Sequence, residues 1–363
     1  MKNLLLIIYR KLFGKMISYG LIRTKIFIVN NNNVKFHDIK NNNLLKSITI
    51  NGFESHENET IKLIKKYNWE MSDFYDIGSN IGHYAVIASL YHKDINVTAV
   101  EPFPLNSEYI DTLKLNNKLS FSLIKKAVDS TTGATKNFYF PVSKNSSKLP
   151  GTGTLINSFK GSGGTYDDLP FETVQVETIT LDDLTKGSGD GILIKMDCEG
   201  NEFNILKSSS LLARNNIDFI IEIMINDLDK NEVFNLMKGH GYNGFLITNA
   251  GLIQENRPLT LPKPDRNDRT LWRNHFFTKK PISEIKQFSI DNYGHWIWIH
   301  CYYSLRVLFP FVGDSIGGSH HSVLELHYAL ENSTITPIFV LHELGPLSDF
   351  LDSLNIKYEY IFI

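Results

Sequence analysis

The chain has 363 residues, with 37 basic and 39 acidic side chains, a formal net charge of -2 and two cysteines. This length suits about two domains of ordinary size. The near-balance of charge argues against a strongly basic nucleic-acid-binding protein, and two cysteines are too few for a disulfide framework. We therefore predict no nucleic-acid partner and a reducing, cytoplasmic setting.

The N-terminal stretch "MKNLLLIIYRKLFGKMISYGLIRTKIF" contains lysines and arginines but no acid. Its apolar run is shorter than the ~20 residues of a membrane span, and no small-residue cleavage site is present. We therefore predict neither a transmembrane helix nor a secretory signal. Two interpretations remain: a helix packed on the domain, or a basic amphipathic contact with the inner, anionic face of a membrane.

Strand and helix patterns alternate from Phe74 onward. Strands are predicted in "FYDIGS", "NVTAVEP" and "FSLIKKAVD", with helices from about Ile81 and over "PLNSEYIDTLKLNN". This βαβαβ pattern indicates a parallel sheet with covering helices. The following segment, residues 137–184, has β-like ends around a loop rich in Gly, Ser and Thr, and predicts a hairpin excursion from the sheet.

The alternation resumes with strands in "GILIKMDCEG", "IDFIIEIM", "YNGFLIT" and "RNHFFTK", separated by helices over "NEFNILKSSSLLARN" and "NEVFNLMKGHG". Seven strands result. After Pro281 an aromatic stretch precedes a second alternation, with strands in "RVLFPF", "ITPIFVLHE" and "KYEYIFI". The predicted fold class is therefore α/β: a seven-stranded sheet with covering helices, plus a partial second Rossmann-like unit at the C-terminus.

A candidate ligand-binding turn, "DIGSNIG", follows the first strand of this sheet. Ligands of open α/β sheets bind beyond the carboxyl ends of the strands, where helix starts offer unpaired N–H groups. The D-x-G-x-x-x-G spacing differs from the dinucleotide fingerprint G-x-G-x-x-G. Glu101, at the end of the second strand, lies where a carboxylate accepts hydrogen bonds from ribose hydroxyls, which indicates a nucleoside cofactor. The alternative is a solvated charge at a strand end.

Several motifs resemble one family in both order and spacing: "DIGSNIGHYAVIA", "VEPFP", "VETITLDDL", "IKMDCEGNEFNILK" and "IIEI". They are similar to the FkbM family of S-adenosylmethionine-dependent methyltransferases from about Phe53 to Lys280. The resemblance implies a class I methyltransferase fold with S-adenosylmethionine as cofactor. It further implies that the methionine end is lined by four turn residues, that the ribose is held by Glu101 and that the adenine is flanked by Asp129; the four are Asp76, Gly78, Asn80 and Gly82.

Asp129 and the neighbouring position His83 each keep an open alternative. Asp129 is equally well explained as a turn residue before "STTG". His83 stands where the family often has an aromatic or small residue, so its role stays open.

Three carboxylates are candidates for the catalytic base or for contacts with the methyl acceptor. Asp197 and Glu199 follow the fourth strand and share one side of it if the chain stays extended, and Glu222 ends the fifth strand. A sugar hydroxyl is a poor nucleophile, so a nearby base helps methyl transfer. We rank them Asp197, Glu199, Glu222. The alternative role is capping of the next helix, which we expect of Glu199 or Glu202 more than of Asp197.

Other chemistry-bearing residues are weaker candidates. His83 and His275 are alternative bases, although a lone histidine is more often structural, and Cys198 is expected to be a small buried side chain at a strand end. Without an HExxH or a paired CxxC motif, the sequence requires no metal. The loop at residues 149–168 is either a lid over the acceptor, with Thr154 and Asn157 as contacts, or a linker.

The leading hypothesis is an O-methyltransferase acting on a sugar or glycan, for example a precursor of a cell-surface polysaccharide. One alternative is an NAD-dependent oxidoreductase, against which the missing G-x-G-x-x-G motif argues. Another is a binding or scaffold module that keeps a nucleoside pocket without turnover. Retention of the three carboxylates favours an enzyme.

The C-terminal segment resembles the opening of a GT-B glycosyltransferase. The resemblance rests on a Gly-Gly turn at Gly317 and Gly318 and on a "GPL" helix start at residues 345–347, while His321 and Glu325 read as a helix face rather than a metal pair. We expect the front part, or a remnant, of a fusion without glycosyl transfer of its own. The predicted boundaries are 1–52 for an N-terminal extension, 53–282 for the methyltransferase domain, 283–302 for an aromatic linker and 303–363 for the glycosyltransferase-like segment.

Overall fold

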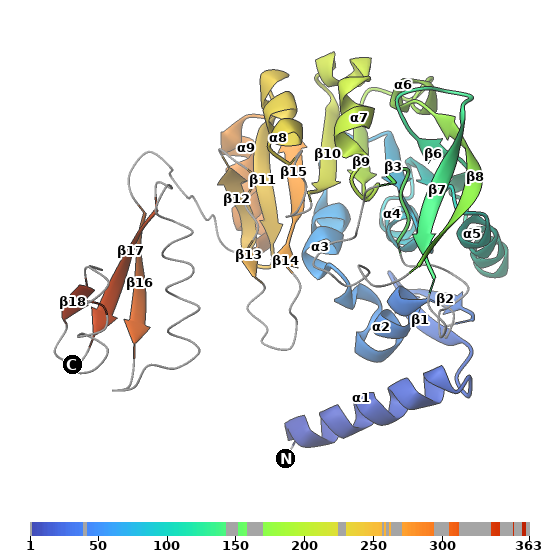
Figure 1. Cartoon of the computed structure of the whole chain (residues 1–363), viewed down its shortest axis with the longest axis horizontal. Helices are drawn as coiled ribbons and strands as arrows, with labels where there is room; N and C mark the ends of the chain where they lie inside the picture. Colours follow the sequence, from blue (N-terminus) through green and yellow to red (C-terminus); the bar gives the residue numbers. More distant parts are fainter. Residues whose placement is uncertain are drawn as a thin grey trace. The chain divides into compact units, whose positions relative to one another are not determined.

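The computed structural model divides the chain into two units, Met1–Ile297 and Trp298–Ile363 (Figure 1). Each is described by itself. The residues described are 2–38, 42–142, 152–157, 170–223, 230–255, 258, 261–262, 271–293, 305–311, 335–341, 351 and 358–360.

The first unit is built on an eight-stranded sheet. In spatial order the strands are β12 (Gly251–Glu255), β11 (Asn243–Thr248), β15 (Asn274–Thr278), β10 (Ile217–Glu222), β9 (Ile192–Met196), β3 (Asp73–Ile77), β4 (Asn96–Val100) and β5 (Ser122–Ile124). Strands β10, β9, β3, β4 and β5 run parallel, and β15 is antiparallel to both β10 and β11. The seven predicted strands are all present, and this doubly wound sheet confirms the class I methyltransferase fold.

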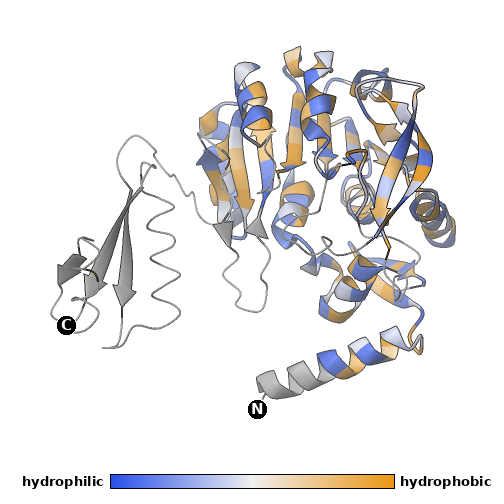
Figure 2. Cartoon of the chain, in the orientation of Figure 1, coloured by the Kyte–Doolittle hydropathy of each residue, from blue (hydrophilic) through white to orange (hydrophobic). Residues whose placement is uncertain are grey.

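The middle strands are apolar along their whole length because both faces of the sheet are covered. In Figure 2 strand β10 is mostly orange, the colour of hydrophobic residues. Phe74 of β3 belongs to one core cluster, whereas the adjacent Tyr75 belongs to the other. One face is covered by α3 (Asn58–Lys66), α4 (His83–Tyr91), α5 (Pro104–Asn117) and α9 (Ile282–Tyr293), the other by α6 (Leu181–Leu184), α7 (Glu202–Lys207) and α8 (Lys230–Gly239).

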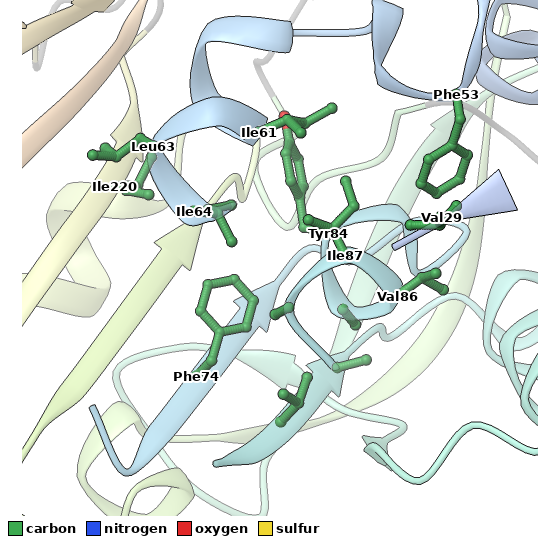
Figure 3. Packing of buried hydrophobic residues seen from close by; sticks show 14 of the residues in the cluster. Val29, Phe53, Ile61, Leu63, Ile64, Phe74, Tyr84, Val86, Ile87 and Ile220 are labelled. Carbon is green, nitrogen blue, oxygen red and sulfur yellow. The ribbon is translucent and has the colours of Figure 1, made fainter. Parts of the chain in front are cut away.

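Figure 3 shows the first of these clusters from close by. Ile61 and Ile64 of α3 lie with Ile87 of α4 over Phe74 of β3 and Ile220 of β10. In α3 the two isoleucines lie on one face, as in an amphipathic covering helix, whereas α4 is buried at every residue from His83 to Ala88. The packing therefore holds α3 and α4 over the strands that carry the predicted site.

The hairpin predicted between the third and fourth strands is confirmed as β7 (Thr135–Pro141) antiparallel to β8 (Phe171–Ile179). The predicted third strand, however, is interrupted. Only β5 joins the main sheet, and β6 (Ala127–Val128) pairs with β8 instead. Lys125 and Lys126 lie between the two strands and form ion pairs with Asp111 and Glu177.

Two further differences concern element ends. The helix expected over residues 201–215 stops at Lys207, and a separate 3-10 turn (Ser210–Ala213) follows. Ser209 causes this break because its hydroxyl caps the new turn, accepting a hydrogen bond from the Leu211 N–H. Strand β12, which pairs with β11 at the edge of the sheet, was not predicted.

The N-terminal segment packs on the first unit instead of standing apart as an extension. It contains α1 (Lys2–Ser18), a hairpin of β1 (Lys25–Val29) and β2 (Asn32–Phe36), and α2 (Asn43–Asn51). Ile17, Phe27 and Leu45 belong to the same core cluster as α3 and α4. No helix in the described ranges is both long and apolar enough to cross a membrane.

The boundaries drawn from sequence also differ at the other end of the unit. Residues 283–293 of the expected aromatic linker are helical and belong to α9. Ile285 and Phe288 of that helix lie in the core beside Leu252 of β12. The helix therefore covers the added edge of the sheet.

The second unit contains a parallel sheet of β16 (Leu305–Phe311), β17 (Ile335–Leu341) and β18 (Tyr358–Tyr360), as the second alternation predicted. The glycosyltransferase resemblance rests on positions that lie outside the described residues: Gly317, Gly318, His321, Glu325 and residues 345–347. That resemblance stays a prediction.

His83 connects α4 to the N-terminal segment. Its ring is 1% exposed, its Nε2 lies 2.9 Å from the Phe53 carbonyl oxygen, and its centroid lies 4.6 Å from that of the Phe53 ring. Burial, with His56 nearby, lowers the pKa of His83 to about 3. The structure thus gives this histidine a packing role and removes it from the candidate bases.

We predict that His83 makes stability depend on pH in a defined direction. Below the ordinary histidine pKa of 6.5 the unfolded chain binds a proton that the folded chain refuses, so the free energy of unfolding falls as pH drops from 6.5 toward 3. Chemical denaturation at several pH values should show a smaller fall over this window in His83→Gln than in the wild type. His240→Gln, at an exposed position, is the control. Equal pH dependence of wild type and His83→Gln would contradict the assignment.

Candidate active site

The turn between β3 and α4 lies directly against the end of β9. Gly78 and Gly82 both have left-handed backbone conformations, with φ of +79° and +77°. A Cβ atom on Gly78 would lie 1.9 Å from the carbonyl oxygen of Asp197. Only glycine permits this approach, and it brings the predicted cofactor turn against the first catalytic candidate.

Asp76 supports this turn through a hydrogen bond to the start of α4. Its side chain is 1% exposed, and its Oδ2 accepts a hydrogen bond of 3.1 Å from the Ala85 N–H in the first turn of α4. Burial raises the pKa of Asp76 to about 7, although Lys195 opposes the shift. The carboxyl group therefore caps the helix and supports the turn.

Glu101 is hydrogen-bonded to Asn80 of the turn. The Glu101 Oε2 accepts a hydrogen bond of 2.8 Å from the Asn80 N–H, and its Oε1 accepts one of 2.9 Å from the Phe103 N–H. Burial raises the pKa of Glu101 to about 8. Asn106 makes a third, side-chain hydrogen bond to this carboxyl group. A carboxylate has about four lone-pair sites, so one acceptor position is left for a ribose hydroxyl of a nucleoside.

Asp129 lies at the end of β6, where the hairpin meets α7. Its Oδ2 forms an ion pair with Lys136 of β7, and its Oδ1 accepts a hydrogen bond of 3.3 Å from Asn201 Nδ2. Burial acts to raise the pKa of Asp129, but the hydrogen bond from Lys136 and other contacts outweigh burial, so the pKa lies below its ordinary value. These contacts give Asp129 a structural role beside the adenine contact that the family resemblance implies.

Asp197 and Glu222 form a hydrogen-bonded carboxyl pair across the ends of β9 and β10. Burial and the Asp197 charge hold the pKa of Glu222 well above its ordinary value. Burial also acts to raise the pKa of Asp197, but Lys195 and the bond from Glu222 outweigh it and lower that pKa. Asp197 is therefore the stronger acid of the pair and is ionised. The Asp197 side chain is 28% exposed, whereas that of Glu222 is 5% exposed.

Two cations neutralise this pair. Lys195 Nζ lies 3.0 Å from Asp197 Oδ2 and 5.2 Å from the centroid of the Tyr84 ring, with its side chain 1% exposed. Arg273, just before β15, forms an ion pair through its Nε with Glu222 Oε1. Burial disfavours the charged forms, yet neighbouring carboxylates raise the pKa of both groups, so both stay cationic.

The segment before α3 supplies a further carboxylate that sequence reasoning missed. Glu57 Oε2 accepts hydrogen bonds from Tyr84 Oη at 2.5 Å and from Asn274 Nδ2 at 2.8 Å. Burial raises its pKa, but His56 and Lys195 among others outweigh burial and lower the pKa to about 2. A single acid before a helix carries no distinctive signal, so only the fold shows that Glu57 joins the site.

Glu199 lies at the edge of the same cluster, in a left-handed conformation with φ of +51°. Its carboxylate accepts a hydrogen bond from Thr152, and its carbonyl oxygen accepts one of 2.9 Å from Thr154 Oγ1. Burial and the Asp197 charge raise the pKa of Glu199 to about 7. Thr154 thus binds the loop to Glu199, whereas the side chain of Asn157 is exposed. Residues 158–168 of the predicted lid lie outside the described part of the chain.

The remaining candidates have structural partners. Glu202, the first residue of α7, accepts hydrogen bonds from the N–H groups of Cys198 at 2.6 Å and Gly200 at 2.9 Å, so it holds the turn before the helix and does not cap the helix as predicted. His275 is fully buried, with Nδ1 2.6 Å from Glu255 Oε2. Cys198 is half-buried at the end of β9. Within the described ranges, no group of three or more His, Cys, Asp or Glu side chains is arranged to hold a metal ion.

The residues fit S-adenosylmethionine: a glycine turn with a helix start, a carboxyl group with an open acceptor position for a ribose hydroxyl, and carboxylates beside the turn that suit a cationic sulfonium. Fold and site together define an S-adenosylmethionine-dependent methyltransferase. Residues 76–243 match the family model described as "Methyltransferase FkbM domain", which confirms the methyltransferase part of the predicted resemblance. No curated protein matches the chain.

Solved methyltransferase structures share low overall similarity with the chain. The precorrin-6y C5,15-methyltransferase of Geobacter metallireducens is 15% identical, with a TM-score of 0.30, over 61% of this chain and 85% of its own. A SAM-dependent methyltransferase of Agrobacterium tumefaciens is 8% identical, with a TM-score of 0.34, over 71% of each chain. TYW2 of P. horikoshii, in complex with MeSAdo, is 12% identical, with a TM-score of 0.33, over 71% of this chain and 72% of its own.

We predict that Gly78→Ala impairs both stability and cofactor binding. Gly133→Ala is the matched control, because Gly133 has φ of +80° but no atom within 4 Å of its would-be Cβ. The control should cost about 1–2 kcal/mol of unfolding free energy from the left-handed conformation alone. Gly78→Ala should lower the free energy of unfolding by more than this. It should also weaken S-adenosylmethionine binding in calorimetry by at least about tenfold, because a displaced turn that loses about 1.4 kcal/mol of binding free energy gives a tenfold change. Equal losses of stability with unchanged affinity would contradict the close approach.

A second prediction concerns Glu101. At about pH 9, above the Glu101 pKa of about 8, Glu101→Ala should weaken S-adenosylmethionine binding by about 1.5–3 kcal/mol, the range for hydrogen bonds to a charged group. Isothermal titration calorimetry measures this, and Glu108→Ala, on the exposed side of α5, is the control. An unchanged dissociation constant in a folded Glu101→Ala protein would remove Glu101 from the ribose site.

Proposed function

We propose that the chain is an O-methyltransferase whose acceptor is a hydroxyl group of a sugar or glycan in polysaccharide biosynthesis. The observation that carries the proposal is the ionised, partly exposed Asp197 carboxylate beside the Gly78 turn. When bound, S-adenosylmethionine supplies an electrophilic methyl group on its sulfonium. A neutral hydroxyl acceptor then needs alignment and a group that takes its proton.

Asp197 is suited to take that proton. As the acceptor oxygen takes up the methyl group, its O–H would become strongly acidic, so a weak base would suffice. Asp197 would receive that proton. Lys195 keeps Asp197 ionised before the transfer, and Glu222 holds it in place through the shared hydrogen bond.

The charge around the site supports an uncharged acceptor. Glu57 and Asp197 are ionised and are balanced by Lys195 and Arg273, while Glu199, with a pKa of about 7, adds negative charge only as it ionises. Within the described cluster no excess positive charge is left to attract a polyanion such as a nucleic acid. A hydroxyl-rich saccharide instead finds both hydrogen-bond acceptors and donors here. The restriction to a sugar rests further on the family resemblance.

The test is methyl transfer from labelled S-adenosylmethionine to a panel of saccharides, with proteins and RNA as alternative acceptors. The proposal predicts label in a base-stable methyl ether on a saccharide. Label that enters only protein, only RNA or a base-labile ester would contradict it.

Asp197→Asn should leave S-adenosylmethionine affinity nearly unchanged and lower kcat by roughly 10²–10⁴, the usual contribution of a catalytic base. Since the pKa of Asp197 is held below its ordinary 3.8, wild-type kcat should stay level from about pH 8 to about pH 5. Asp190→Asn, at an exposed position, is the control. If kcat instead falls steadily below pH 7, the base is Glu199, whose pKa is about 7.

A further inference from the structure

The first unit exposes an apolar surface on its N-terminal elements. Of the eleven exposed large apolar side chains among the described residues, six fall between residues 12 and 28. We call this group, with the basic residues among it, the N-terminal surface. Its apolar members are Leu12, Met16, Tyr19, Leu21, Ile26 and Ile28.

These side chains are exposed although their elements are firmly packed. In α1, Ile17 is fully buried in the core, while Leu12 on the same helix is 60% exposed. In β1, Phe27 and Val29 are buried, so the alternation of a strand turns Ile26 and Ile28 outward. The side chain of Ile28 is 77% exposed, so folding of this chain does not remove its apolar surface from water. Apolar surface grouped in this way marks an interaction site.

The helix and the strand form one continuous surface. At Gly20, with φ of +71°, the chain turns back, and the Leu21 N–H donates to the Met16 carbonyl oxygen at 2.9 Å. This turn leads directly into β1, whose Lys25 Nζ lies 5.9 Å from the centroid of the Phe13 ring on α1. The end of α1, the turn and β1 are therefore neighbours.

The charge on this surface has a single sign. Residues 1–37 contain no aspartate or glutamate, so the exposed side chains of α1 and of the following turn are not neutralised within the segment. Lys35 of β2 faces outward opposite Ile26 and adds to the charge. Figure 2 shows polar and apolar residues interspersed along the coloured part of α1. The exposed basic residues are Arg10, Lys11, Lys15, Arg23 and Lys35.

We propose that the N-terminal surface docks on an anionic lipid bilayer. Apolar side chains that enter the headgroup region and cations that meet anionic lipids are the two contributions to interfacial binding, and this surface offers both together. A nucleic acid would use the cations but not the apolar side chains. Contact between two copies would set like charges against each other.

The placement of this surface agrees with the site. The segment between α1 and α3 lies at the carboxyl edge of the sheet, where Asn42 Nδ2 donates to Asn80 Oδ1 of the cofactor turn at 3.2 Å (Figure 1). Docking would therefore hold the carboxyl edge near the membrane. This proposal does not depend on the identity of the methyl acceptor.

Co-sedimentation with phosphatidylcholine vesicles, with and without phosphatidylglycerol, tests the docking. The full chain should bind only vesicles that contain phosphatidylglycerol, and should be released at about 1 M salt, where the Debye length is about 3 Å. Lys11→Gln and Lys15→Gln should each weaken binding about fivefold. A triple variant with Leu12→Ser, Leu21→Ser and Ile28→Ser should bind these vesicles much more weakly than the wild type, even at high protein concentration.

Lys238→Gln on α8 and Ile282→Ser at the start of α9 are the matched controls, which should bind like the wild type. Unfolding temperature and S-adenosylmethionine affinity should be equal in all variants, which separates loss of docking from loss of folding. The proposal is overturned if the intact chain fails to bind anionic vesicles at low salt, or if the controls lose as much binding as the test variants. A DNA duplex bound in place of vesicles, or a dimer abolished by the triple variant without vesicle binding, would assign the surface to those partners instead.

Discussion

The Nζ atom of Lys195 is almost completely shielded from water, and it lies 3.0 Å from Asp197 Oδ2. A buried ammonium group is tolerated only when opposite charges replace its hydration. Here Asp197, Glu57 and Glu222 supply them, so β9, β10 and the segment before α3 must converge on one point. The site is therefore a structural constraint on the fold as well as a place for chemistry, and the N-terminal segment is part of it.

A backbone contact connects this charged cluster to the cofactor turn. Because the chain at Gly78 approaches the Asp197 carbonyl so closely, any movement of the turn also moves the end of β9. Glu101 fixes the other side of the turn through the Asn80 N–H. Cofactor position and base position are thereby set by the same few contacts, which is the requirement for alignment of a methyl group with its acceptor.

The functional proposals stand on different features of the molecule. Methyl transfer to a hydroxyl follows from an ionised carboxylate at the carboxyl edge of the sheet, and membrane docking follows from apolar and basic side chains on α1 and β1. They meet in the chain that precedes α3, which contacts the cofactor turn through Asn42 and contributes Glu57 to the site. The fold thus lets one short segment serve both the active site and the surface beside it.

The sequence by itself determined the seven strands, the glycine turn, Glu101 and the carboxylates at the ends of β9 and β10, because apolar runs and turn residues are local signals. Local signals did not separate β5 from β6, or show that Asp76 caps α4. Only the tertiary structure decided that Glu57 and Arg273 join Asp197 and Glu222, since these residues lie far apart in the chain. The protonation of the pair was also decided there, because burial and neighbouring charge, and not residue type, set each pKa.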